Sequence, residues 1–307
     1  MKQCAFFGRC GGCKYDFSDA DYRAKKSDEL KQICPADNAV WIAPGGRRRG
    51  DFCFAAGKFG LFARGTKDIV PVARCENMVD AINDILPRLA QLPWAGAGSC
   101  MVTACDNGID IAITSNVGHF TSAFKDAVEK TGAIRATWNG RVVFQNVVPV
   151  INFDGKTVEY PPYAFLQPSV AGADALRDMV VAAAAGAKKV ADLFCGLGNF
   201  TYALDADGFD VFGTGICRDL FTRPLTLGML RQYDCVVMDP PRAGAMAQCR
   251  VLAKSDVKKI IYVSCNPQTF RRDAKILTDG GYKMVQIVPV DQFAGSGHWE
   301  IFSVFQK

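Results

Sequence analysis

The sequence predicts an α/β protein whose C-terminal part, residues 165–307, forms a doubly wound parallel sheet. Five short apolar runs recur there, and helical stretches separate most of them. Such runs, bounded by turns, are typical of parallel strands buried on both faces. They lie at residues 190–194, 210–213, 234–239, 259–264 and 284–290. Ligands of such sheets bind at the carboxyl ends of the strands, so the functional site is expected there.

Two segments precede this sheet. Residues 1–78 begin with a loop rich in Gly and Cys, and a helix is predicted over 19–34 with Leu30, Ile33 and Cys34 on one face. Short strands with Gly turns follow over 40–75, which is the signature of β-hairpins. Residues 79–164 combine strand-like runs with helices near 78–92 and 120–131, and Pro87 is expected to kink or end the first helix. The second segment is therefore a mixed α/β domain.

Composition narrows the class of protein. The chain has 307 residues, 49% of them hydrophobic and 22% charged, which are the values of an ordinary globular protein. It contains neither an apolar run long enough to span a membrane nor a signal-peptide h-region. We therefore expect a cytoplasmic monomer without membrane association. The net charge of +5 permits a nucleic-acid partner without requiring one.

Four of the thirteen cysteines have the spacing of metal ligands. Cys4, Cys10 and Cys13 are closely spaced, and Cys75 stands alone far downstream. Three clustered thiolates with one remote thiolate are typical of an iron–sulfur cluster, and a zinc site is the alternative. The other scattered cysteines, among them Cys217, are interpreted as small core residues.

A basic stretch lies between these cysteines. Arg47, Arg48 and Arg49 are followed by further Lys and Arg residues, with phenylalanines interleaved on Gly-punctuated strands. This pattern suits a surface that binds RNA phosphates. The alternative is a solvated hairpin face whose aromatic side chains lie in the core.

Two turns rich in Gly or Pro follow predicted strands. Residues 192–201 contain Gly196 and Gly198, which allow a tight turn and a close approach to a ligand. The third glycine of the dinucleotide-binding pattern is absent. Residues 239–244 contain a rigid Pro-Pro turn that fixes Asp239 and Arg242 at a strand end. Taken alone, each stretch is also compatible with a purely structural turn.

Two further residues have the positions of catalytic groups. Cys265 follows the strand at 259–264 and lies in a polar turn, where a nucleophile is expected and a core cysteine is not. Glu300 enters the last predicted strand and could reach the same cleft as a general base. The alternatives are an inert buried thiol and a carboxylate at the strand edge.

Together these motifs closely resemble the RNA uracil-5-methyltransferase family, and within it the iron–sulfur branch that acts on 23S ribosomal RNA. The similarity also covers residues 59–65 and 165–168, so it runs nearly end to end. It implies a Rossmann-like S-adenosylmethionine-dependent methyltransferase domain over 165–307. It further implies an iron–sulfur segment with a basic β-hairpin over 1–78 and a central RNA-binding domain over 79–164.

The resemblance also assigns roles. Cys265 adds to C6 of uracil, C5 takes the methyl group, and Glu300 removes the C5 proton. Arg242 orients the uracil or a flanking phosphate. The positions that match the family's cofactor contacts are Gln167, Phe194, Gly196, Asn199, Asp219 and Asp239, and the ligands of a 4Fe-4S cluster match Cys4, Cys10, Cys13 and Cys75.

One segment departs from the family pattern. Gly215 stands where the family has an acidic residue for the ribose hydroxyls, and about one helix-and-strand unit after it is missing. We expect the nucleotide half of the cofactor pocket to be affected. Two alternatives follow: a methyltransferase acting on the T-loop of tRNA, and a non-catalytic iron–sulfur RNA-binding protein.

Overall fold

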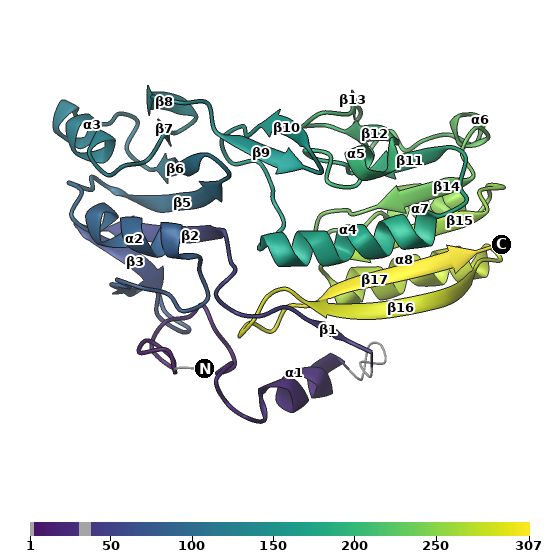
Figure 1. The fold of residues 1–307 in the computed structure, drawn as a ribbon, viewed down its shortest axis with the longest axis horizontal. Coiled ribbons are helices and arrows are strands. Elements are labelled where there is room, and N and C mark those ends of the chain that lie inside the picture. The colour runs from purple at the N-terminus through teal and green to yellow at the C-terminus, as the bar shows by residue number, and fades with distance from the viewer. Residues whose placement is uncertain (1–2, 31–37) are drawn as a thin grey trace.

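The computed structural model describes residues 3–30 and 38–307 and contains two large sheets, seen side by side in Figure 1. The eight-stranded sheet, here called the catalytic sheet, has the order β1-β16-β17-β15-β14-β11-β12-β13. These strands span Val40–Trp41, Lys283–Asp291, Glu300–Gln306, Lys259–Ser264, Cys235–Met238, Val190–Leu193, Asp207–Asp210 and Ile216–Cys217. Four of the five predicted runs coincide with strands of this sheet, whereas the run at 210–213 shares only Asp210 with β12. The antiparallel strand β17 lies between β15 and β16.

Helices cover both faces of the catalytic sheet. The side chains of β14 alternate between two cores: Cys235 and Val237 pack with α4 (Val170–Ala184), whereas Val236 and Met238 pack with α7 (Met246–Leu252) and α8 (Pro267–Asp279). This alternation explains why the central strands read as continuous apolar runs. Two one-turn helices, α5 (Thr201–Leu204) and α6 (Leu227–Leu230), complete the three layers.

The second large sheet has seven strands in the order β4-β3-β2-β5-β6-β7-β8. They span Ile69–Val70, Lys58–Phe62, Arg49–Ala55, Ala97–Cys105, Gly108–Ser115, Arg135–Trp138 and Arg141–Gln145. The helices α2 (Asp80–Leu89) and α3 (Ser122–Glu129) share its core, and a small pair, β9 (Val150–Phe153) and β10 (Lys156–Glu159), leads to the catalytic sheet. The predicted boundary at residues 78 and 79 therefore falls inside one sheet.

The N-terminal segment crosses to the catalytic sheet (Figure 1). Strand β1 pairs in parallel with β16, and α1 (Tyr22–Leu30) packs beside it. Lys26 is fully buried, and its ammonium group lies 2.6 Å from a carboxylate oxygen of Asp291 at the end of β16. Tyr22 donates a hydrogen bond to the same carboxylate. Residues far apart in the sequence thus fasten the first helix to the last part of the sheet.

The structure corrects several predicted elements. The strand expected over 210–213 is β12, Asp207–Asp210, which ends where the predicted strand begins. Helix α2 continues past Pro87 to Leu89. Cys217 is exposed at the edge of the sheet instead of in the core. Ile33 and Cys34, assigned to the face of the first helix, lie outside the described residues.

Among the described residues, no helix has both the length and the apolar character needed to cross a membrane.

Candidate active site

A cavity of about 350 Å³ opens at the carboxyl ends of the parallel strands. It brings together residues from four motifs that are far apart in the sequence. Eight of the predicted site residues line it: Gln167, Phe194, Gly196, Asp219, Asp239, Arg242, Cys265 and Glu300. Asn199 lines a smaller cavity that shares five of its lining residues with this one. The sheet topology therefore gathers the predicted catalytic and cofactor residues at one edge.

Local structure positions the two predicted catalytic side chains. Cys265 lies between the end of β15 and the start of α8, where the side chain of Asn266 caps the helix and Pro267 occupies its first turn. The side-chain amide of Asn266 also donates a hydrogen bond of 2.9 Å to the backbone carbonyl of Arg242. Glu300 is the first residue of β17, which pairs with β15. Both side chains are thus held by neighbouring antiparallel strands.

A chain of side-chain amides joins the two carboxyl groups in the cavity. Gln167 donates a hydrogen bond of 2.9 Å to Asp239. Gln292 donates bonds of 2.8 Å to Gln167 and 2.9 Å to Glu300. Burial raises the pKa of Glu300 to about 7. Burial and the nearby Glu300 carboxylate raise the pKa of Asp239 well above its usual value.

The thiol of Cys265 is not activated in the ligand-free protein. Burial, followed by the negative charges of Glu300 and Asp239, raises its pKa to about 12. At neutral pH the group is therefore a thiol, because burial disfavours the thiolate and negative charge on the nearby carboxyl groups disfavours it further. A cation bound in the same cavity would favour the thiolate, which is the nucleophilic form.

The glycine-rich turn lies under the cavity. Phe194 adopts a left-handed backbone conformation with φ of 63°, and the backbone N–H of Gly196 donates a hydrogen bond of 2.9 Å to the carboxylate of Asp210. Asp210 also lines the cavity, at the carboxyl end of β12. Sequence reasoning missed this residue because it placed the strand three residues too late. Its signal was an acidic residue that ends a strand next to the Gly-rich turn.

Position 215 has no room for the acidic side chain that the family pattern has there. A Cβ atom at this residue would lie 2.7 Å from the backbone of Gly208 and from the sulfur of Cys195. The shortened segment thus packs directly against β12, and only a residue without a side chain fits there. Asp219, further along, lines the cavity, and its carboxylate accepts hydrogen bonds from Thr222.

The three consecutive arginines do not share one exposed face, contrary to the expectation from the sequence. Arg47 lines the cavity that also holds the four clustered cysteines. Arg48 is 6% exposed and lines the small cavity beside Asn199. Arg49 lies over the ring of Phe165, with 5.8 Å between its guanidinium carbon and the ring centre. Arg47 and Arg48 precede β2, and only Arg49 belongs to the strand, so the three side chains do not share the face of one strand.

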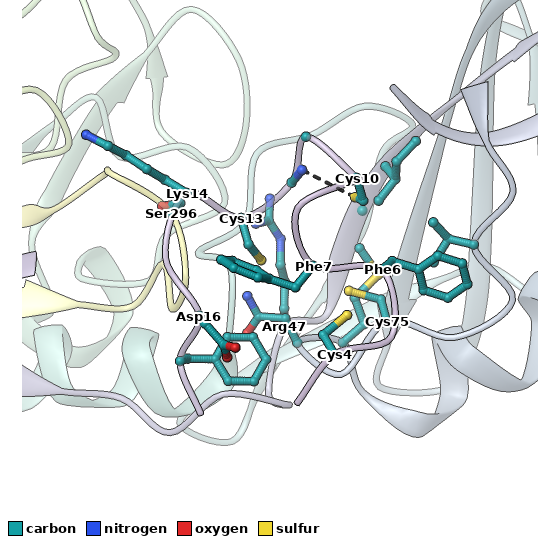
Figure 2. A pocket seen from close by; sticks show the side chains of 18 of the residues that line it. Cys4, Phe6, Phe7, Cys10, Cys13, Lys14, Asp16, Arg47, Cys75 and Ser296 are labelled. Carbon is teal, nitrogen blue, oxygen red and sulfur yellow. Dashed lines mark hydrogen bonds between the residues drawn. The ribbon is translucent and has the colours of Figure 1, made fainter. Parts of the chain in front are cut away.

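Cys4, Cys10, Cys13 and Cys75 line one cavity of about 370 Å³. Figure 2 shows the four cysteine side chains around this space, with Arg47 beside them. Burial raises the pKa of Cys13 to about 12, and the other three cysteines add to the shift. Within the described residues, no three Cys, His, Asp or Glu side chains converge closely enough to hold a single metal ion.

Arg242 links the two cavities. Its side chain lines the active-site cavity, and a terminal nitrogen lies 3.1 Å from a ring nitrogen of His298. His298, with Ser296 and Gly297, forms part of the wall of the cysteine cavity. The loop that leads into Glu300 therefore separates the predicted cluster site from the predicted catalytic site.

Comparisons with known proteins agree with this arrangement. The fold resembles that of the tRNA (uracil-54, C5)-methyltransferase of Pyrococcus abyssi, with a TM-score of 0.73 at 21% identity over 94% of this chain and 83% of the other. A family model described as tRNA (Uracil-5-)-methyltransferase matches residues 218–307. The fold is thus that of the S-adenosylmethionine-dependent methyltransferases.

Sequence relatives define the family. An uncharacterized RNA methyltransferase of Rhizobium meliloti is 35% identical over 343 residues, covering 98% of this chain and 83% of the relative. A 23S rRNA (uracil(1939)-C(5))-methyltransferase of Haemophilus influenzae is 27% identical, covering 99% of this chain and 81% of the relative. The chain therefore belongs to the RNA uracil-5-methyltransferase family. Because the first alignment is longer than the 307 residues of this chain, the relative contains residues that this chain lacks.

Proposed function

We propose that this protein methylates C5 of a specific uridine in 23S ribosomal RNA through a covalent adduct between Cys265 and C6 of the base. The observation that carries the proposal is the single cavity lined by Cys265, Glu300, Asp239 and the Gly-rich turn. The similarity to a 23S ribosomal RNA enzyme over 99% of the chain supports the choice of RNA.

The chemistry follows from the two side chains. Uracil C5 is a poor nucleophile, and addition of the Cys265 sulfur to C6 makes it enolate-like. S-adenosylmethionine supplies an electrophilic methyl group and a positive charge. Glu300 then takes the proton from C5, and cleavage of the C6–sulfur bond frees the cysteine. The target base has to leave its stack to reach a cavity of this kind.

The cavity fits a methyl donor. Both atoms of the Asn199 side-chain amide are buried without a hydrogen-bond partner among the described residues, as expected for a group awaiting a ligand. Gln167, Phe194 and Gly196 line both adjoining cavities and would hold the centre of the cofactor. We assign the ribose contact to Asp210 in place of Gly215, with Asp219 on the side of the base.

A 4Fe-4S cluster held by the four clustered cysteines is the second part of the proposal. A tetrahedral zinc site needs all four sulfurs about 2.3 Å from one point. The four cysteines instead line one cavity of about 370 Å³, and within the described residues no three of the possible ligands converge on a single point. Protein purified without oxygen should contain iron and sulfide and show visible charge-transfer absorption. Cys75→Ser should remove both signals, and one zinc per chain instead of iron would contradict the assignment.

Covalent trapping tests the function. The protein is incubated with S-adenosylmethionine and a 23S ribosomal RNA fragment that contains 5-fluorouridine, whose C5 has no proton for Glu300 to remove. We expect a complex that survives denaturing electrophoresis and is absent with Cys265→Ala. If wild-type protein and Cys265→Ala behave alike, the proposed chemistry is wrong.

The same assay decides between RNA classes. A tRNA T-arm fragment is the competing substrate, because the solved structure with the similar fold is a tRNA enzyme. If only the T-arm fragment is trapped, the substrate is tRNA and not ribosomal RNA. Binding of RNA without any binding of the methyl donor would favour the non-catalytic iron–sulfur RNA-binding protein.

A further inference from the structure

The small cavity beside the active site contains a buried guanidinium group. This cavity has a volume of about 60 Å³ and is lined by Arg48 together with Gly196, Asn199 and Asp239. Arg48 is only 6% exposed, and burial lowers its pKa. A guanidinium group with so little exposed surface normally has an anionic partner, because desolvation of an isolated charge is costly.

The protein itself does not supply that partner within the described residues. Among the described residues, the side chain of Arg48 donates one hydrogen bond, of 3.3 Å from Nε to the backbone carbonyl of Gln167. No described carboxylate forms an ion pair with its guanidinium, and Asp106 and Asp174 favour its charge only over longer distances. Arg135, the other deeply buried arginine in this part of the molecule, illustrates the contrast, because its Nε lies 2.6 Å from Asp110.

Asn199 provides an independent observation. Its amide nitrogen and oxygen are both buried and both lack a hydrogen-bond partner among the described residues. A buried amide left in this way costs free energy unless a ligand satisfies it. Arg48 directly precedes β2 of the second sheet and Asn199 lies in the Gly-rich turn, so two separate parts of the chain line the same small space.

We infer that Arg48 and Asn199 bind the α-carboxylate of the amino-acid part of the methyl donor. This inference rests on the proposed function. The two cavities share Phe165, Gln167, Phe194, Gly196 and Asp239 as lining residues. A ligand with its carboxylate on Arg48 would extend past Gly196 and place its sulfur near Cys265 and its nucleoside near Asp210. Asp239 would then face the α-ammonium group.

The assignment also explains why Arg48 is not an RNA contact. The cavity beside Arg48 is lined by the apolar side chains of Phe153, Leu166 and Leu197. This cavity has room for a carboxylate and an amine but not for a nucleotide. A guanidinium binds a carboxylate through two parallel hydrogen bonds, which fixes the orientation of the ligand as well as its affinity.

The experiment compares two ligands by calorimetry. S-adenosylhomocysteine contains the amino-acid part, whereas 5′-methylthioadenosine keeps the nucleoside and lacks the carboxylate. Arg48→Met should lower the affinity for S-adenosylhomocysteine by about 10- to 100-fold, the range for a hydrogen bond to a charged group. The affinity for methylthioadenosine should stay unchanged. Arg48→Lys should recover part of the loss. Asn199→Ala should also lower the affinity for S-adenosylhomocysteine.

Controls separate the possible failures. Arg141→Met changes an exposed arginine on β8 and should alter neither affinity. If Arg48→Met weakens both ligands equally, Arg48 supports the fold and does not bind the carboxylate. Unchanged binding of both ligands also overturns the inference. If the wild-type protein binds neither ligand, the proposed function itself fails, and the carboxylate site with it.

Discussion

The two proposed catalytic side chains oppose each other electrostatically. Burial raises the pKa of Glu300 to about 7, and burial together with Glu300 raises the pKa of Cys265 to about 12. A site that held both groups charged without a ligand would be strained. The arrangement keeps the nucleophile protonated until a substrate and a cationic cofactor enter the cavity.

Removal of the base should expose the order of the steps. Glu300→Gln keeps the shape of the side chain and removes its basicity, so turnover should fall by about 10²- to 10⁴-fold. The adduct between Cys265 and ordinary, unfluorinated RNA should accumulate, because its breakdown needs loss of the C5 proton. Denaturing electrophoresis detects it. Glu159→Gln, on the exposed strand β10, is the matched control.

An adduct that forms no more often with Glu300→Gln than with wild-type protein would assign the base to another group. Asp239 is then the candidate, because it is the other carboxylate that lines the cavity near Cys265.

Asp192 gives a pH dependence to stability. Burial raises the pKa of this carboxyl group to about 7 in the folded protein, whereas in the unfolded chain it has the ordinary value near 4. The folded state therefore binds the proton more tightly. Its contribution to stability is fully present below pH of about 4 and is lost as the pH rises through about 7. Asp192→Asn should thus raise Tm relative to wild type more at pH 8 than at pH 5.

Thermal unfolding at several pH values measures this difference. Asp234→Asn is the control, because that residue is only partly buried and the pKa of its carboxylate is lowered by hydrogen bonds from backbone N–H groups. A Tm difference for Asp192→Asn that is constant from pH 5 to pH 8 would contradict the argument.

At the scale of elements, the connection from β12 to β13 is the unusual part of the catalytic sheet. It leaves Val211, Phe212 and Ile216 exposed and ends in a strand of two residues at the edge. We propose that Asp210, the last residue of β12, takes the place of the carboxylate that the family pattern has after this strand. The shortened connection therefore keeps an acidic group beside the Gly-rich turn.

Asp210→Asn tests this replacement. The loss of a charge-assisted hydrogen bond, worth about 1.5–3 kcal/mol, should lower the affinity for S-adenosylhomocysteine by tenfold or more. The affinity for methylthioadenosine should fall to the same extent. Equal effects on both ligands distinguish this contact from the one proposed for Arg48. Asp205→Asn changes an exposed neighbour outside both cavities and should have no effect. Unchanged affinity with Asp210→Asn would leave Asp219 as the acidic contact.

The sequence predicted the central strands and helices of the catalytic sheet well, because buried runs and turn residues are local signals. Strand β12 was displaced because its limits depend on pairing with β11 and not on its own composition. The cleft containing Cys265, Asp239 and Gly196 was also predictable, since all three lie at the carboxyl ends of parallel strands. The burial of Arg48 was not predictable, because it results from the contact between two sheets.

The N-terminal segment ties the whole molecule together. The buried pair of Lys26 and Asp291 joins α1 to the end of β16, and the backbone N–H groups of Lys14 and Tyr15 donate hydrogen bonds to the carbonyl of Gly295. These contacts hold the loop that precedes Glu300. The sequence did not predict them, because residues 26 and 291 are related only by the final fold.

Loss of this pair should destabilise the protein. Lys26→Met leaves the buried Asp291 carboxylate without its cation, which costs about 3–5 kcal/mol. Urea unfolding should show a lower midpoint. Adding Asp291→Asn to this variant should recover part of the loss, since the unpaired charge is then removed. Lys25→Met removes an exposed ion pair on the same helix and should leave the urea midpoint nearly unchanged.

If the double variant is as unstable as Lys26→Met, packing and not charge explains the effect of residue 26. If Lys26→Met and Lys25→Met unfold at the same urea concentration, the pair does not hold the segment in place.

The pairing of β1 with β16 has a consequence for the order in which the chain acquires its structure during synthesis. Residues 40 and 41 are made long before their partners at 290 and 291. Lys26 and Asp291 are separated by 265 positions, so the first helix has no docking site until Asp291 has been made. The cysteine-rich segment can therefore dock onto the catalytic sheet only after residues 290 and 291 have been synthesised.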